Sequence, residues 1–224
     1  MNNKDKNSND RIAVVDRKTK ETQIKIELNV DGKGDSVVKT PIGFFTHMLE
    51  AFAKHGLFDM NVEISGDIEI DQHHTIEDTG ICLGQAFKKA LGDKKGINRA
   101  GYFVYPMDES LAVVAVDIGG RPLCVFDAEF KRRFCGEMDT DLVEDFFIGF
   151  SQGLGANVQV KMPYGRNDHH KIEGIFKAFT KAMKMACEIN EKVKERIPST
   201  KGMIENKWIE EIKIVGVNWK WQNH

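Results

Sequence analysis

An internal repeat is the feature that most narrows the folds open to this chain. A shift of 96 positions aligns three pairs of similar segments: NVEI (61–64) with NVQV (157–160), His73-His74 with His169-His170, and Glu77 with Glu173. A repeat of about a hundred residues indicates a duplicated half-domain, because the units of solenoids are much shorter. We therefore predict an α+β fold built from two similar units.

Periodicity within the repeat predicts the elements of each unit. Apolar and polar residues alternate in 22–30, as in a half-buried strand, and apolar residues recur at helical spacing in 44–56. We predict that each unit is a small mixed β-sheet with two helices on one face, and that the helices of the two units pack between the sheets. The first unit spans 11–98 and the second spans 99–202.

Two terminal segments lie outside the repeat. Residues 1–10 are polar and lack the apolar core of a signal peptide or membrane anchor, so we predict a disordered lead-in. The C-terminal extension 203–224 alternates after residue 209 and holds all three tryptophans. This extension is a candidate for an added strand or for covering a subunit contact.

Charge and cysteine content exclude several classes of function. The net charge is only −2, so no basic field favours nucleic acid or an anionic membrane surface as a partner. The four cysteines form no CxxC pair, which indicates unpaired thiols in a reducing compartment and argues against a zinc cluster. We expect a cytoplasmic protein.

The duplicated His-His-x-x-Glu motif predicts a metal centre. If the motif opens a helix, His73 and Glu77 lie one turn apart on one face, whereas His74 is rotated by about 100°. Each of two sites would then combine one His-x-x-x-Glu pair with the odd histidine of the other unit: His73 and Glu77 with His170, and His169 and Glu173 with His74. One such motif alone is more often a surface feature, but two matched copies favour ligation. These ligands suit Mn²⁺, Zn²⁺ or Fe²⁺.

Two further histidines lie in the helix predicted over 44–56. His47 is another candidate ligand, although a half-buried histidine that binds nothing is an equally good interpretation. His55 directly precedes Gly56, which ends the helix. It is typical of a residue that interacts with the dipole at a helix C-terminus.

Basic residues in turns predict a phosphate site. Arg99 lies in GINRAG, Arg121 in GGRP, and Ser199 and Lys201 in PSTKG. Guanidinium groups, an ammonium group, a hydroxyl and loop amides together suit a phosphomonoester, although each residue alone is more often a solvated turn residue. The chain has no Walker loop and no GxGxxG at a strand–helix boundary, so little supports nucleotide binding.

Seven segments, in order along the chain, resemble the imidazoleglycerol-phosphate dehydratase family. They are RKTKET (17–22), GFFTHMLEAFAKHG (43–56), DQHHTIEDTGICLGQA (71–86), PMDES (106–110), DIGGRP (117–122), NDHHKIEGIFKAF (167–179) and PSTKG (198–202). The resemblance implies the ribosomal S5 domain 2-like fold. It also implies a metal-dependent hydro-lyase of histidine biosynthesis that removes water from imidazoleglycerol phosphate to give imidazoleacetol phosphate.

The resemblance further implies a cofactor and an assembly. Two Mn²⁺ ions would bind both ring nitrogens of the substrate, so that the resulting imidazolate expels the hydroxyl group. The protein would be a homo-oligomer, a 24-subunit cage assembled from trimers, with active sites at subunit contacts. Its partner would be a small phosphorylated imidazole.

Residue roles also follow from the resemblance. One metal would be held by His47, His74, His169 and Glu173. The other would be held by His73, Glu77 and His170. Glu21 would face the glycerol carbons as the general base, with Glu77 and Glu173 as competing candidates. The phosphate would be surrounded by Arg99, Arg121, Lys177, Ser199 and Lys201.

The repeat adds one ligand to the second metal. Aligning HMLEAF (47–52) with DFFIGF (145–150) sets His47 on Asp145, if the loop that follows is two residues shorter in the second unit. Asp145 is therefore the predicted fourth protein ligand of the site with His73, and a carboxylate there favours Mn²⁺.

One departure from the family and two other functions stay open. Thr46 stands where the family often has Asp, and a carboxylate there would orient a ligating histidine. A metal-dependent hydrolase would also need a metal, but it has no use for two metals spaced across an imidazole. A non-enzymatic metal-binding cage would not need Glu21 or the basic cluster.

Overall fold

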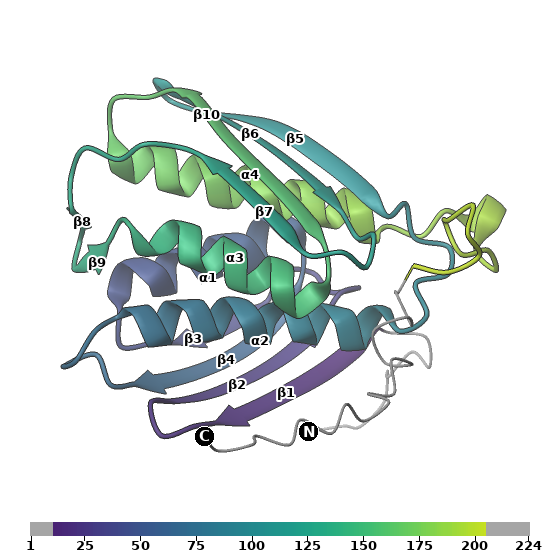
Figure 1. The fold of residues 1–224 in the computed structure, drawn as a ribbon, viewed down its shortest axis with the longest axis horizontal. Helices are drawn as coiled ribbons and strands as arrows, with labels where there is room; N and C mark the ends of the chain where they lie inside the picture. Colours follow the sequence, from purple (N-terminus) through teal and green to yellow (C-terminus); the bar gives the residue numbers. More distant parts are fainter. Residues whose placement is uncertain (1–10, 205–224) are drawn as a thin grey trace, which may run out of the picture.

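Two four-stranded β-sheets enclose a layer of helices in this protein (Figure 1). The structure is a computed structural model and describes residues 11–204. The lead-in predicted over 1–10 and the strand predicted after 209 lie outside the described residues.

The first unit forms one mixed sheet, with strand order β1-β2-β4-β3. Its neighbours pair antiparallel except β3 and β4, which are parallel. The elements are β1 (Ile12–Lys18), β2 (Thr22–Asn29), β3 (Ser36–Lys39), α1 (Gly43–Gly56), β4 (Asp59–Gly66) and α2 (His73–Leu91).

The second unit repeats this topology in the strand order β5-β6-β10-β7, with β7 parallel to β10. The elements are β5 (Ala100–Met107), β6 (Ser110–Asp117), β7 (Leu123–Asp127), α3 (Leu142–Leu154), β10 (Asn157–Tyr164) and α4 (Asp168–Cys187). A short hairpin of β8 (Phe134–Cys135) and β9 (Met138–Asp139) precedes α3, and a 3-10 helix, η1 (Glu191–Val193), follows α4. The predicted α+β architecture is confirmed.

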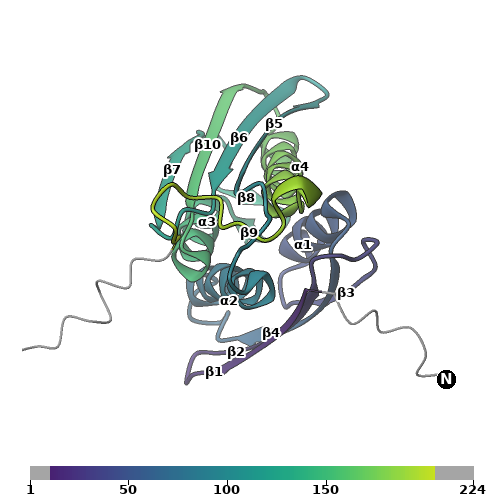
Figure 2. The ribbon, with the colours of Figure 1, turned by 90° about the vertical axis from the view of Figure 1, so that its right-hand side faces the viewer.

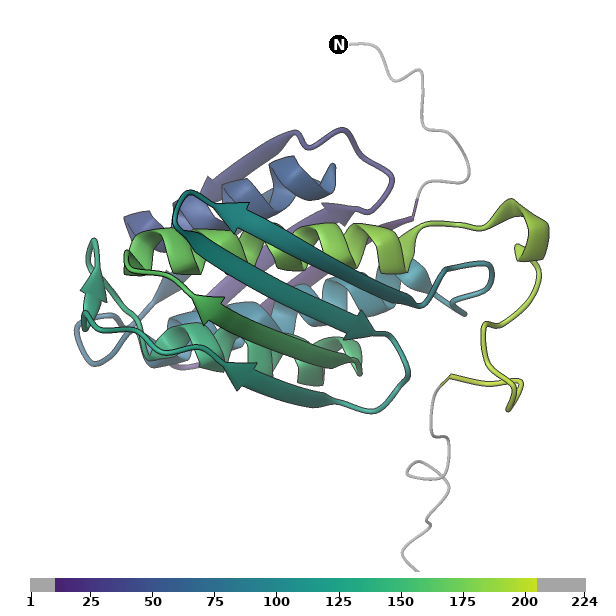
Figure 3. The ribbon, with the colours of Figure 1, turned by 90° about the horizontal axis from the view of Figure 1, so that it is seen from above.

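The helices lie between the sheets, as the duplicated pattern predicts (Figure 2). Seen from above, the strands of the second sheet run across α4 and α3 (Figure 3). Alternate residues of β2 and β6 point inward and are buried, among them Ile24, Ile26, Val114 and Val116. Burying these side chains against apolar helix faces stabilises the fold by roughly 1.5–3 kcal/mol for each large side chain.

The two units match residue by residue in their burial. The buried positions of α1 recur in α3 at a shift of 98, and the helices end in equivalent left-handed residues, Leu57 and Gly155. Met60 of β4 lies opposite Leu28 of β2, and Val158 of β10 lies opposite Val116 of β6. Met60 and Val158 are therefore equivalent residues, so β4 and β10 also match at a shift of 98. The two-residue shortening therefore lies in the loop before the second helix, and not after the first helix as the alignment of NVEI with NVQV implied.

Glycines let α2 and α3 approach closely. A Cβ atom on Gly149 would lie 2.6 Å from the carbonyl oxygen of Glu77, and one on Gly84 would collide with the carbonyl of Phe150. No larger residue fits such a contact. This close packing sets the distance between the candidate metal ligands of α2 and Asp145 on α3.

No helix among residues 11–204 is long and apolar enough to cross a membrane. All four cysteines are free, and Cys82, Cys135 and Cys187 are buried. Burial raises the pKa of Cys82 to about 11 and that of Cys187 to about 12. These thiols are therefore protonated and unreactive at neutral pH.

Candidate metal centre

Both His-His-x-x-Glu motifs lie at helix N-termini, which is the condition that the ligand argument required. His73 is the first residue of α2, and His169 is the second of α4. The two helices begin at the same end of the molecule, on the left in Figure 1. The repeat therefore brings all four histidines of the motifs to one end of the fold.

The β8–β9 hairpin fixes the starts of α1 and α2 at this end. The Glu137 carboxylate accepts the backbone N–H groups of Gly43 and Phe44, which caps the N-terminus of α1. The Gln72 side chain donates to the carbonyl of Glu137 at 2.8 Å and accepts the N–H of Asp139 at 3.1 Å. One hairpin thus holds the helix of His47 beside that of His73.

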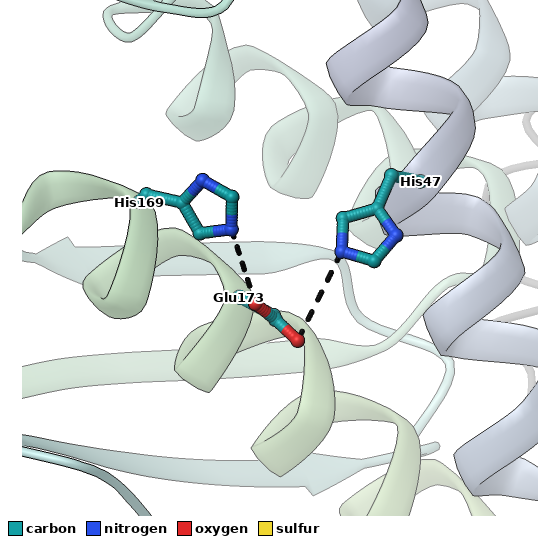
Figure 4. A group of neighbouring side chains, drawn as sticks. All are labelled: His47, His169 and Glu173. Carbon is teal, nitrogen blue, oxygen red and sulfur yellow. Dashed lines mark ion pairs between the residues drawn. The ribbon is translucent and has the colours of Figure 1, made fainter.

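His47, His169 and Glu173 converge from α1 and α4 (Figure 4). The Glu173 carboxylate lies 3.2 Å from Nε2 of His169 and 3.9 Å from Nε2 of His47. One potential ligand atom from each residue lies within 4.8 Å of the other two. Two imidazoles and a carboxylate at this spacing suit a divalent transition-metal ion.

Lys177 is the other partner of Glu173. Its ammonium group lies 2.7 Å from the carboxylate and over the ring of Tyr105. Burial opposes ionisation of Glu173, but the hydrogen bond and charge of Lys177, together with His47 and His169, hold the pKa of Glu173 below its usual value. Glu173 is only 8% exposed and anionic, and the anionic form is the one that binds a metal.

A second group forms around His73. Its Nε2 lies 3.5 Å from the Glu77 carboxylate, and its Nδ1 lies 3.1 Å from the Asp145 carboxylate on α3. The structure therefore places Asp145 beside the histidine that the repeat assigned to it. The two carboxylates face different nitrogens of the ring.

The second histidine of each motif has a carboxylate on Nδ1. Asp67 lies 3.2 Å from Nδ1 of His74 and raises the pKa of that histidine. Glu109 lies 2.8 Å from Nδ1 of His170, and its hydrogen bond to His170 lowers the pKa of Glu109 to about 2. Because a carboxylate only accepts hydrogen bonds, Nδ1 carries the proton and Nε2 keeps its lone pair for a metal. The sequence analysis missed both carboxylates.

Within one chain, the contacts among residues 11–204 do not complete either predicted ligand set. The group of His47, His169 and Glu173 does not include His74, and the contacts of His73 do not include His170. His170 instead lies in a separate cluster of possible ligands with Asp108 and Glu109.

The predicted phosphate residues lie at the opposite end of the fold, apart from Lys177. Arg99 donates to both carboxylate oxygens of Asp117, at 2.7 and 3.0 Å, and to the carbonyl of Pro198 at 3.0 Å. It thereby anchors the PSTKG loop. The exposed side chain of Lys201 belongs to this loop, and Ser199 accepts the Lys201 N–H at 3.2 Å.

Arg121 lies in the turn that follows Gly120, beside the same end of the molecule. The position of a Cβ atom on Gly119 would be 3.1 Å from the Arg99 guanidinium group, so this turn adjoins the Arg99 side chain. Arg121 itself is exposed. The turn that holds Arg121 and the loop that holds Ser199 and Lys201 therefore both adjoin Arg99, away from the histidines.

Glu21 and Thr46 also have defined surroundings. Glu21 is exposed in the turn between β1 and β2, where its carbonyl accepts the N–H of Asp67 at 3.1 Å. Its carboxylate is close enough to help raise the pKa of His74. The Thr46 hydroxyl interacts with Thr40 at 2.9 Å and with the carbonyl of Ile42 at 3.2 Å, so it stabilises the start of α1.

A family model described as imidazoleglycerol-phosphate dehydratase matches residues 40–183. The chain belongs to this family. The resemblance seen in the seven sequence segments is confirmed, and the matched span includes every histidine of the candidate metal centre.

Relatives named imidazoleglycerol-phosphate dehydratase match along both repeats. The protein of Koribacter versatilis is 55% identical over 194 residues, which cover 87% of this chain and 100% of that protein. The protein of Caldicellulosiruptor saccharolyticus is 52% identical over 196 residues, which cover 88% and 100%. A histidine biosynthesis bifunctional protein of Spirosoma linguale is 52% identical, but the match covers only 50% of its length.

Solved structures of the family share the fold. Imidazoleglycerol-phosphate dehydratase of Staphylococcus aureus has a TM-score of 0.72 and 37% identity, covering 80% of this chain and 99% of that one. The Pyrococcus furiosus enzyme in complex with (S)-C348 has a TM-score of 0.74 and 34% identity, covering 84% and 99%. The chain is thus a dehydratase of histidine biosynthesis, and a hydrolase or a metal-storing cage is not favoured.

Proposed function

We propose that this dehydratase acts on imidazoleglycerol phosphate at a site with two divalent cations, assembled between copies of the chain. One observation carries the proposal: His47 and the pair His169 and Glu173 come from different repeats and converge on one point. This convergence places two imidazole groups and an anionic carboxylate within reach of one divalent cation.

The donor groups fit two metal sites. The first would contain His47, His169 and Glu173, with His74 supplied by another copy. The second would contain His73, Glu77 and Asp145, with His170 supplied by another copy. When bound, the cations would supply the positive charge that stabilises the deprotonated imidazole ring, from which the hydroxyl group is then expelled.

The separation of the two ends supports assembly between copies. Arg99 contacts the C-terminal end of α4, where its N–H donates to the carbonyl of Ala186, whereas His169 lies at the N-terminal end. The helix has 20 residues and is therefore about 30 Å long. A small phosphorylated imidazole is too short to reach both ends of one chain. The phosphate-binding residues Arg121, Ser199 and Lys201 would therefore belong to a site completed by the histidines of a neighbouring copy.

Within this site, each remaining residue has a role that its chemistry allows. Lys201, Ser199 and Arg121 would bind the phosphate, and Arg99 would hold the loop in place. Lys177, which neutralises Glu173 in the single chain, would move its ammonium group to the substrate phosphate. Glu21 would take the proton from the glycerol carbon, since its turn adjoins His74.

Mn²⁺ is the proposed metal, because Asp145 adds a third carboxylate to two sites already supplied with Glu77 and Glu173. The proposed assembly is a 24-mer built from trimers in the cytoplasm. Exposed apolar residues on the outer sheet faces support self-association. They are Ile12, Val14, Val37, Tyr102, Val104, Leu123, Val125 and Tyr164.

The test compares metal-free and Mn²⁺-loaded protein with imidazoleglycerol phosphate as substrate. Chelation should abolish formation of the ketone product and reduce the assembly size measured by light scattering, and added Mn²⁺ should restore both. His47→Asn should lose activity, whereas the matched change His55→Asn in the same helix should not. A fully active metal-free preparation would exclude the proposal.

A further inference from the structure

The turns that open β2 and β6 are equivalent in the two repeats. Each strand begins with a buried hydroxyl residue, Thr22 in β2 and Ser110 in β6, and the inward-facing apolar residues follow at the same spacing. The residue before each hydroxyl is a glutamate. Glu109 is therefore the counterpart of Glu21 in the second repeat.

The two glutamates face equivalent histidines but make different contacts. Glu21 adjoins His74, the second histidine of the first motif. Glu109 lies against His170, the second histidine of the other motif, with its Oε2 atom 2.8 Å from Nδ1. Its Oε1 atom accepts the N–H of Asn167 at 2.7 Å. Duplication thus placed a glutamate near the second histidine of each motif. Of the two glutamates, Glu109 is the one that forms a hydrogen bond with its histidine.

We propose that Glu109 is a positioning residue for His170, an inference that rests on the metal site proposed above. The carboxylate accepts the Nδ1 proton of His170, which fixes the tautomer and leaves the Nε2 lone pair free. It also fixes the ring, because the same carboxylate holds Asn167, whose side chain caps α4 by accepting the N–H of His169 at 3.0 Å. Glu109 thereby aims Nε2 of His170 at a cation.

Glu109 acts through His170 and not as a ligand itself, because its Oε2 atom lies against Nδ1, the ring nitrogen opposite the one that faces a metal. The other acidic residue here is Asp108, which lies on the Nε2 side of the ring at 3.7 Å. Asp108 is largely exposed and makes no hydrogen bond with the ring at that distance.

The experiment titrates Mn²⁺ into chelator-treated full-length protein by calorimetry, with thermal unfolding of the same samples. Glu109→Gln keeps the size of the side chain, but an amide cannot accept from both Asn167 and His170. Its NH₂ group, turned toward Nδ1, favours the tautomer whose proton blocks Nε2. One of the two bound Mn²⁺ ions per chain should therefore bind about 10–100-fold more weakly. The other should be unchanged, and the melting temperature of the metal-free protein should stay close to that of the wild type.

Two further variants complete the test. Glu63→Gln, at an exposed residue paired with Lys39 at 3.4 Å, makes the same change elsewhere and should leave both affinities unchanged. Asp108→Asn should leave them nearly unchanged as well. Wild-type affinity of both ions in Glu109→Gln would overturn the inference. So would an equal loss in Asp108→Asn, because it would show that Asp108, Glu109 and His170 bind a metal together. Metal affinity and thermal unfolding are measured without the substrate. The inference can therefore be tested even if the protein does not dehydrate imidazoleglycerol phosphate.

Discussion

The Asp145 carboxylate on α3 lies 3.1 Å from Nδ1 of His73, and the Glu77 carboxylate lies 3.5 Å from Nε2 of the same ring. Asp145 occupies the position of His47 in the other repeat, since the buried residues of α1 and α3 superimpose at a shift of 98. A residue found by symmetry in the sequence thus lies beside the histidine that the symmetry indicated.

Asp145→Ala should release one of the two cations per chain, with the other still bound, because only the His73 site loses an anionic ligand. Metal analysis after dialysis measures the stoichiometry directly. Asp145→Asn separates two roles, since an amide oxygen still accepts the Nδ1 proton but is a weaker ligand. We expect it to lose the same ion, and retention of both ions would mean that Asp145 orients the ring from outside the site.

Lys201→Ala and Arg121→Ala should each raise the KM for the phosphorylated substrate and leave the bound metal unchanged. Loss of one charge-assisted contact costs about 1.5–3 kcal/mol, equivalent to roughly 10–150-fold in binding. Steady-state kinetics with metal analysis measures both effects. Lys33→Ala removes an exposed lysine elsewhere and serves as the control. Unaltered kinetics in both variants would remove these residues from the phosphate site.

Glu21→Gln should keep metal and substrate binding while turnover falls by about 10²–10⁴-fold, the usual contribution of a general base. Single-turnover kinetics on Mn²⁺-loaded protein separates the proton transfer from binding. If turnover survives, Glu77 or Glu173 becomes the base.

The sequence was sufficient for the architecture, because the repeat determines both sheets and the helical layer. The sequence misplaced the two-residue shortening of the second unit. The similar segments NVEI and NVQV align Asn61 with Asn157, whereas strand pairing shows that Val62 is the counterpart of Val160. Periodicity cannot detect a two-residue change in a loop when either alignment keeps apolar residues inward.

The carboxylates behind the histidines were not predictable from spacing. Asp67 lies in a loop and Glu109 in a tight turn, and each reaches a histidine only because the chain folds back. Lys177, which was expected at the phosphate, lies 2.7 Å from the Glu173 carboxylate in the single chain, a contact that spacing did not indicate. The proposed site, shared between copies, would bring together residues that neither the sequence nor one chain places side by side.

Gly149→Ala should destabilise the protein by about 1–3 kcal/mol, although alanine favours helices. The added methyl group would lie 2.6 Å from the carbonyl oxygen of Glu77, a backbone atom of α2 that cannot turn away. Gly174→Ala is the matched control, because its methyl group would meet only Met107 and Ala112 at ordinary distances of 3.4 and 3.7 Å. Urea unfolding should show a loss for the first variant and no loss for the second; similar stability in both would contradict the tight helix contact.

The buried ion pair at the start of α4 has the largest expected effect on stability. Asp168 is 1% exposed and lies 2.8 Å from the ammonium group of Lys171, and it also accepts the N–H groups of Lys131 and Arg132 at 2.9 and 2.7 Å. Asp168→Asn would leave a buried ammonium group without its counter-charge, which costs roughly 3–5 kcal/mol. Asp127→Asn, in an exposed pair with Lys161, should cost about 0–1 kcal/mol.

The same pair gives stability a defined pH dependence. Burial opposes ionisation of Asp168, but Lys171 and the two backbone N–H groups hold its pKa below the usual value. Because the pKa of Asp168 is lower in the folded state, its carboxylate contributes fully to the free energy of unfolding above the unfolded pKa of about 3.9. This contribution is lost as the pH falls through the folded pKa. The difference in unfolding free energy between wild type and Asp168→Asn should therefore be constant from pH 7 to about pH 5 and shrink below about pH 4. Urea titrations at each pH measure this difference, and one that grows on acidification would show that the carboxyl is not stabilised as an anion.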